Sequence, residues 1–143
     1  MTGLLPAPGV PGLLNGSIPP GVYRLPPTES VPLAVSLAAE SDWRAAVLRL
    51  KGVTGKAAFL DQSASDLEFP AWFGKNWDAL ADCLMDLSWW RNEGKARGYL
   101  LLTEDWDPFS KAAPKDARTA EAILTEAVDY WADREAPLAV LLG

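Results

Sequence analysis

Three aspartates recur at regular intervals in the middle of the chain, and their spacing is the clearest indication of chemistry. Asp78, Asp82 and Asp86 lie four residues apart, so on a helix they would form one stripe. Such a stripe is typical of a solvated helix face, of a divalent-metal site, or of an anionic strip that binds a cationic protein surface. Successive turns of one straight helix spread carboxylates too widely to surround one ion, which disfavours the metal. The charge pattern alone leaves the other two interpretations open.

The remaining side chains disfavour an enzyme. The chain has no histidine, which removes the commonest general base and metal ligand, and Cys83 is its one cysteine. It also lacks the glycine-rich motifs that bind nucleotide phosphates. Catalysis would have to use the three aspartates, supported by lysine, arginine or tyrosine. We therefore expect a protein that binds rather than catalyses, with no catalytic residue, no metal and no cofactor.

Charge and composition limit the class of partner. The formal net charge of the chain is −6, which disfavours direct binding of nucleic acid and is compatible with a basic protein partner. No run approaches the roughly 18 apolar residues that suggest a membrane span. Residues 1–14 lack the basic start of a signal peptide, and a lone cysteine suits a reducing compartment. We expect a cytoplasmic protein that does not bind a membrane.

A helix over residues 76–88 would position the acidic stripe. Asn76 is suited to cap this helix, because its side-chain oxygen can accept a hydrogen bond from a free N–H group of the first turn. Lys75 is predicted to pair with Asp78 or to contact the backbone. The apolar residues that recur at helical spacing and form the predicted buried face are Trp77, Leu80, Cys83, Leu84 and Leu87.

Strands and helices are predicted to alternate around this helix. The expected strands are 21–25, 43–50, 99–103 and 138–142. The other expected helices run from Thr28 or Ser30 to about residue 41, from Thr54 to about 67, and over 115–133, with 105–114 irregular or in a short helical turn. The alternation predicts an α/β fold with a small, mostly parallel sheet of three to four strands packed with helices. Residues 1–20, rich in Pro and Gly, are predicted to form a loose tail, and 21–143 a single domain.

One segment of the sequence has a specific family resemblance. The run Trp72-Phe-Gly-Lys-Asn-Trp-Asp-Ala-Leu-Ala-Asp-Cys-Leu84 closely resembles the aromatic-aromatic-Gly-x-Asn-x-Asp-Ala-Leu-x-Asp-Cys-Leu segment of the barstar family. The likeness extends more weakly over residues 44–143 and leaves 1–43 as an N-terminal addition with a strand and a helix. It implies a barstar-like fold, in which this helix and the loop before it plug the active site of a barnase-type ribonuclease.

The resemblance also assigns roles to individual residues. It implies that Trp72 is a partner-contacting aromatic and that Gly74 and Asn76 shape the loop entering the helix. It further implies that Asp78 pairs with basic residues of the nuclease and that Asp82 occupies the phosphate-binding site. A rigid carboxylate can satisfy the arginines and lysines that such a nuclease needs for phosphate.

The chain departs from the family pattern at two of the expected partner-binding positions. Ala81 stands where the best-studied relative has a second contacting aromatic. Tyr130 stands, by ungapped counting from the C-terminus, where the family has a further carboxylate on its last helix. The acidic residues that could substitute if the register slips are Glu126, Asp129 and Asp133. Trp89 and Trp90 follow the acidic helix, near a family aromatic.

Two hypotheses for the function follow. The leading one is an inhibitor of a basic, barnase-type ribonuclease, acting as an immunity protein that protects its producer from its own toxin. The alternative is a binding module of the same fold that recognises another basic protein and does not inhibit a nuclease. A third and weaker interpretation is an enzyme that uses the carboxylates of Asp78, Asp82 and Asp86.

Overall fold

The computed structural model describes residues 2–87 and 96–143, and strands and helices alternate through most of this range. The elements in chain order are α1 (Val10–Asn15), β1 (Val22–Arg24), α2 (Val31–Glu40), β2 (Trp43–Arg49), α3 (Lys56–Asp66), α4 (Trp77–Met85), β3 (Gly98–Glu104), α5 (Trp106–Ala112), α6 (Pro114–Trp131) and β4 (Leu138–Leu142). Within these residues, no helix is long and apolar enough to cross a membrane.

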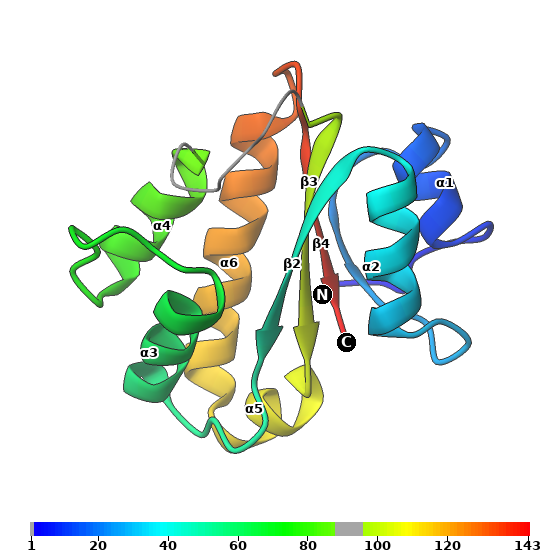
Figure 1. Ribbon diagram of the computed structural model, residues 1–143. Helices are drawn as coiled ribbons and strands as arrows, with labels where there is room; N and C mark the ends of the chain where they lie inside the picture. The colour runs from blue at the N-terminus through cyan, green and yellow to red at the C-terminus, as the bar shows by residue number, and fades with distance from the viewer. Residues whose placement is uncertain (1, 88–95) are drawn as a thin grey trace.

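The four strands form one sheet in the order β1-β4-β3-β2 (Figure 1). All three pairings are parallel, and Val140 of β4 lies between Val22 of β1 and Leu101 of β3. Every residue of β4, and every residue of β3 except Glu104, is buried. This explains the uninterrupted apolar character of both strands, because a central parallel strand is covered on both faces. The predicted α/β class and the predicted small parallel sheet are confirmed.

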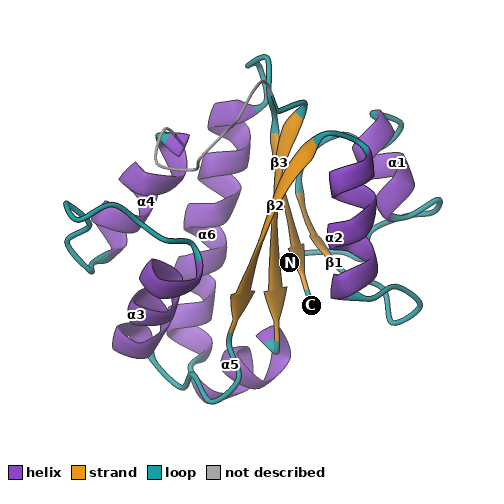
Figure 2. Ribbon diagram, in the orientation of Figure 1, coloured by secondary structure: helices purple, strands orange, loops and turns teal. Residues whose placement is uncertain are grey.

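Helices cover both faces of the sheet and divide the interior into two cores (Figure 2). Leu101, Val140 and Leu142 point to the face covered by α3, α4 and α6. Leu100 and Leu141 point to the opposite face, which α1 and α2 cover. The alternation follows from the two-residue period of a strand, whose successive side chains point to opposite faces. The acidic helix α4 thus belongs to the layer on the α6 side.

The predicted loose tail at residues 1–20 is wrong. Residues 10–15 form helix α1, and Val10 and Leu13 are each only 1% exposed within the second core. The Glu29 carboxylate accepts a hydrogen bond of 3.0 Å from the N–H of Val10 at the start of α1. Leu4 forms an isolated parallel bridge with Arg24 of β1. The segment folds because tertiary burial outweighs the poor helix propensity of its proline and glycine residues.

Two helix starts can be compared with the prediction. Ser30 is one of the two residues predicted to cap this helix, and it does cap α2. Its hydroxyl accepts a hydrogen bond of 3.2 Å from the N–H of Leu33. Thr54 does not cap α3: the helix begins at Lys56, and its N-cap is Gly55, with no side-chain hydrogen bond. Phe59 and Leu60 of this helix are both buried in the first core.

Candidate protein-binding site

The acidic helix α4 begins at a well-formed cap. Asn76 has an extended backbone, and its side-chain oxygen accepts a hydrogen bond of 2.7 Å from the N–H of Ala79. The Asn76 side-chain amide donates to the carbonyl of Gly74 at 3.4 Å. A side chain at Gly74 would crowd this arrangement, since a Cβ there would lie 3.2 Å from Nδ2 of Asn76. The cap therefore fixes the direction in which the loop enters the helix.

The acidic helix is shorter than predicted at its other end. It stops at Met85, and Asp86 is the C-cap residue with an extended backbone (φ −128°, ψ 90°). Its N–H still donates to the carbonyls of Asp82 and Cys83. Because Asp86 has left the helical path, the predicted stripe of three aspartates is wrong, and only Asp78 and Asp82 share the helix face. The predicted helix end at Ser88, together with Trp89 and Trp90, lies outside the described residues.

The apolar face of α4 anchors the helix in the first core. Leu80, Cys83, Leu84 and Leu87 are all buried, and Trp77 is partly buried beside Phe59. Burial raises the pKa of the Cys83 thiol to about 11, and the carboxylates of Asp82 and Asp86 add to this rise. A thiol in this state is neutral at ordinary pH and packs as a small apolar group.

The carboxylates of Asp78 and Asp82 are both exposed, on adjacent turns of one face of α4. Within residues 2–87 and 96–143, neither carboxylate forms an ion pair. One prediction was that Lys75 would pair with Asp78, and this is wrong. Its ammonium group lies 3.3 Å from the carboxylate of Asp61 on α3. In the same part of the chain, no cluster of three or more acidic or cysteine side chains is arranged to hold a metal ion.

The loop before α4 presents a large aromatic side chain to solvent. Trp72 is 55% exposed, and tryptophan is among the residues enriched at binding hot spots. The loop itself is supported, because the rings of Phe69 and Phe73 are 4.8 Å apart and pack against the first core. Lys75 ties the end of the same loop to α3 through Asp61. The loop that carries the exposed Trp72 side chain is thus anchored at Phe69, Phe73 and Lys75.

Helix α6 supports the far end of α4. The indole N–H of Trp131 donates a hydrogen bond of 2.8 Å to the carbonyl of Leu84. Leu84 lies in the last turn of α4, where carbonyls lack partners within the helix, so this bond satisfies one of them. The sequence places Trp131 on the buried face of its helix, but its periodicity gives no sign that the indole would bind the end of α4.

Tyr130 lies next to this support and is 41% exposed. The guanidinium of Arg134 stacks over its ring, 3.9 Å from the centroid. The position that the family resemblance equates with a carboxylate therefore carries an aromatic ring covered by a cation. The acidic residues considered as substitutes, Glu126, Asp129 and Asp133, are all exposed. Arg134 was not singled out from the sequence, because it lies in the turn after α6 ends at Trp131, where helical spacing no longer predicts contacts.

The geometry brings the predicted site residues into one region. Trp72, Gly74 and Asn76 lead into α4, and α4 presents Asp78, the partly exposed Ala81 and Asp82. Tyr130 comes from α6, the helix that packs beside α4. A helix with exposed carboxylates that follows a loop with an exposed tryptophan is the kind of surface that binds another macromolecule.

The fold and this surface define a small α/β protein with an exposed acidic helix. The chain belongs to the barstar family: the family model described as "Barstar (barnase inhibitor)" matches residues 43–143. A comparison with curated proteins gave no match. The match covers β2 to β4 and the helices between them, so β1, α1 and α2 precede the matched region.

Proposed function

We propose that this protein inhibits a basic, barnase-type ribonuclease by placing α4 and the loop before it over the active site of the nuclease. The observation that carries the proposal is the pair of exposed carboxylates, Asp78 and Asp82, on one supported face of α4. A nuclease that holds phosphate with arginine and lysine offers the matching charges. The protein would act by occupying the site, without a cofactor or a chemical step.

The rigidity of α4 favours this mode of binding. Asn76 caps the start of the helix, and the Trp131 indole holds its end. A carboxylate that is already fixed in place loses less conformational entropy on binding than one on a mobile loop. The exposed Trp72 side chain would supply the apolar contact beside the charges, as large aromatic residues do at many interfaces.

Inhibition of RNA cleavage tests the proposal directly. The protein should abolish cleavage by a barnase-type nuclease at stoichiometric concentration. Asp82→Ala should weaken inhibition about 10- to 150-fold, the range expected when a charge-assisted interaction worth about 1.5–3 kcal/mol is lost. Glu40→Gln is a matched control, because it removes one exposed negative charge from α2 on the opposite face of the sheet. Equal inhibition by Asp82→Ala and the parent protein would contradict the assignment.

A second candidate function is the binding of a different basic protein without nuclease inhibition. It is favoured by the stacking of Arg134 over Tyr130, which places a cation where the family resemblance implies an anion. Affinity capture from the native host distinguishes the two candidates when the captured protein is assayed for ribonuclease activity. The leading proposal predicts a captured nuclease that Asp82→Ala no longer retains, and the second predicts a partner without that activity.

The proposed setting of the inhibitor is the cytoplasm, where it would protect the producing cell from its own nuclease. Cys83 is the one cysteine in the sequence, so no disulfide can form within the chain, and this suits a reducing compartment.

A further inference from the structure

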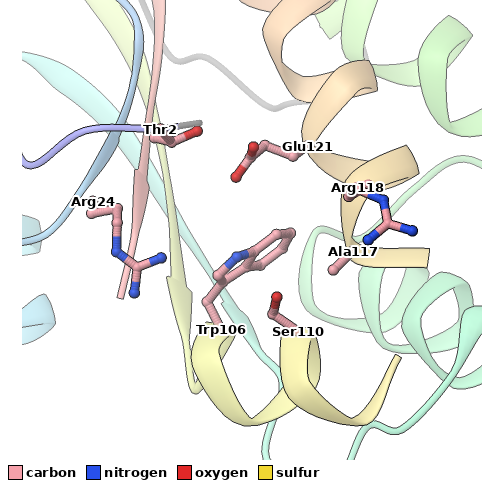
Figure 3. Close-up of a pocket in the computed structure, with 7 residues that line it drawn as sticks. All are labelled: Thr2, Arg24, Trp106, Ser110, Ala117, Arg118 and Glu121. Atoms are coloured by element: carbon pink, nitrogen blue, oxygen red, sulfur yellow. The ribbon is translucent and has the colours of Figure 1, made fainter. Parts of the chain in front are cut away.

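The carboxyl edge of the sheet contains a cavity that the proposed function does not use. Its volume is about 650 Å³, within the range of about 300–1,000 Å³ typical of sites for small molecules. Arg24 is the last residue of β1, and Trp106 begins α5 directly after β3. Both line the cavity, together with Ser110 of α5 and Arg118 and Glu121 of α6 (Figure 3). The acidic face of α4 contributes no residue to it.

The topology of the chain places this cavity where open α/β sheets commonly bind ligands. From the carboxyl end of β1 the chain continues to α2, which packs on one face of the sheet. From the carboxyl end of β3 it continues through α5 to α6 on the other face. In the sheet, β4 lies between β1 and β3, and the cavity is lined from the carboxyl ends of β1 and β3 and from α5 and α6. The N-terminal addition creates this arrangement, because it supplies β1 and its connection.

The charged groups around the cavity favour an anion. Figure 3 shows Arg24 and Arg118 on opposite sides of Trp106. Arg24 forms an ion pair with Asp107, whereas Arg118 is exposed and forms no ion pair within residues 2–87 and 96–143. Ala117, another lining residue, lies in the first turn of the 18-residue helix α6. The N–H of Ala117 already donates to the carbonyl of Ala113, so the cavity lies along the side of this helix and not over its free N–H groups.

The remaining lining residues set the size and polarity of the ligand. The Trp106 side chain is only 3% exposed, so it forms a fixed wall. The hydroxyl of Ser110, which lines the cavity near Trp106, can form a hydrogen bond with a ligand. Glu121 carries a negative charge that opposes a second anionic group. A ligand with one oxyanion group on an uncharged body fits this distribution of charge.

We propose that this cavity binds a small organic ligand with a single oxyanion group, either a phosphate or a carboxylate, which Arg118 holds. The guanidinium group of Arg118 would bind the oxyanion in the planar, two-pronged geometry that arginine offers to phosphate and carboxylate alike. The uncharged body of the ligand would occupy the rest of the cavity, with Trp106 as part of its wall. This inference does not depend on the proposed nuclease inhibition, because the two surfaces share no residue.

The proposal can be tested by NMR titration of the full chain with three matched probes: phenyl phosphate, benzoate and benzyl alcohol. The amide signals of Arg24, Ser110 and Glu121 should shift saturably with one or both anions, at concentrations up to about 10 mM, and not with the alcohol. Binding of phenyl phosphate alone assigns a phosphate ligand, and binding of benzoate alone a carboxylate ligand. No saturable shift with either anion, or equal shifts with the alcohol, would overturn the proposal.

Three variants separate a specific site from general attraction of anions. Arg118→Gln should weaken binding of the anion about tenfold or more. Glu121→Gln should strengthen binding several-fold, because it removes a like charge, and a folding defect could not produce that gain. Arg49→Gln removes an exposed arginine from the end of β2 at the other edge of the sheet and should leave binding unchanged. Equal weakening by Arg118→Gln and Arg49→Gln would show that no site exists.

Discussion

Asp78 and Asp82 lie on the same face of α4, but the helix affects them differently. Asp78 is in the first turn, where the free N–H groups and the helix dipole stabilise an anion. Asp82 is one turn further on and gains little from either. The two carboxylates also repel each other at a spacing of four residues. The negative charge of Asp82 is therefore not needed for the stability of the isolated protein.

This conflict predicts opposite effects of one substitution on stability and binding. Asp82→Asn should raise the free energy of unfolding by about 0.2–0.5 kcal/mol, because it removes the repulsion with Asp78. The same change should weaken the binding of a basic partner. Urea denaturation compared with the nuclease inhibition assay measures both effects. A loss of stability greater than about 1 kcal/mol would mean that Asp82 supports the fold instead.

Cys83 predicts a loss of stability at high pH. Its thiol pKa is raised from 9.0 to about 11 by burial and by nearby carboxylates. Between these values the unfolded chain loses the thiol proton and the folded chain keeps it, so the free energy of unfolding should fall as pH rises through this range. Below pH 9 the thiol is protonated in both states and makes no such contribution. The fall should be smaller in Cys83→Ala, and urea denaturation of both proteins at several pH values would measure the difference.

At the scale of elements, α4 depends on contacts at its two ends. The nine-residue helix is short, and isolated helices of this length are marginal in water. The Asn76 cap, the buried apolar face and the Trp131 bond to Leu84 compensate for this. Lys75, with φ 52°, turns the chain into the helix and reaches back to Asp61 of α3. These contacts give α4 a fixed orientation relative to α3 and α6.

Removing the cap should therefore damage both the helix and the site. Asn76→Ala should lower the free energy of unfolding by about 1 kcal/mol, because the N–H of Ala79 loses its partner. Asn76→Asp is the matched control, since aspartate caps helices about as well as asparagine. Hydrogen exchange at the amides of α4 should increase in the alanine variant and remain slow in the aspartate variant. Equal exchange in the two variants would show that the cap does not hold the helix.

At the scale of the whole molecule, the N-terminal addition completes a domain that the family region alone leaves open on one side. Leu100, Leu102, Ala139 and Leu141 are all fully buried, and their cover comes from α1 and α2. The addition also contributes β1 to the edge of the sheet beside β4. Arg24 of β1 forms an ion pair with Asp107 of α5. This ion pair is a further contact between the N-terminal addition and the matched region.

Removal of residues 1–42 should accordingly destabilise the matched region. The exposed sheet face would be apolar and contiguous, and such surfaces bind hydrophobic dyes and associate. We expect the truncated protein to bind anilinonaphthalene sulfonate strongly and to elute from a sizing column as oligomers. Arg24→Gln in the full chain is the control, because it breaks one contact of the addition and leaves both helices in place. A monomeric truncated protein with the stability of the full chain would contradict the prediction.

The sequence predicts the strands and most helices of residues 21–143 well and residues 1–20 poorly, for physical reasons. The Asn76 cap and the apolar strands β3 and β4 depend on local pattern, which a sequence displays directly. Helix α1 contains Pro11 and Gly12, whose low helix propensity conceals the apolar spacing of Val10, Leu13 and Leu14. The early end of α4 was missed because no glycine or proline follows Met85 closely. The pairing of Lys75 with Asp61 depends on how α3 packs, which local pattern does not contain.

The central place of β4 in the sheet has a consequence for the time course of folding. Val140 of β4 pairs with Leu101 of β3 but also with Val22 of β1, a residue far away in the sequence. Closing a long loop costs more entropy than closing a short one, so the β3–β4 pairing should form before the β1–β4 pairing. The second core can be completed only after that late step. During refolding, the family region should therefore become compact while one apolar face of its sheet is still exposed to solvent.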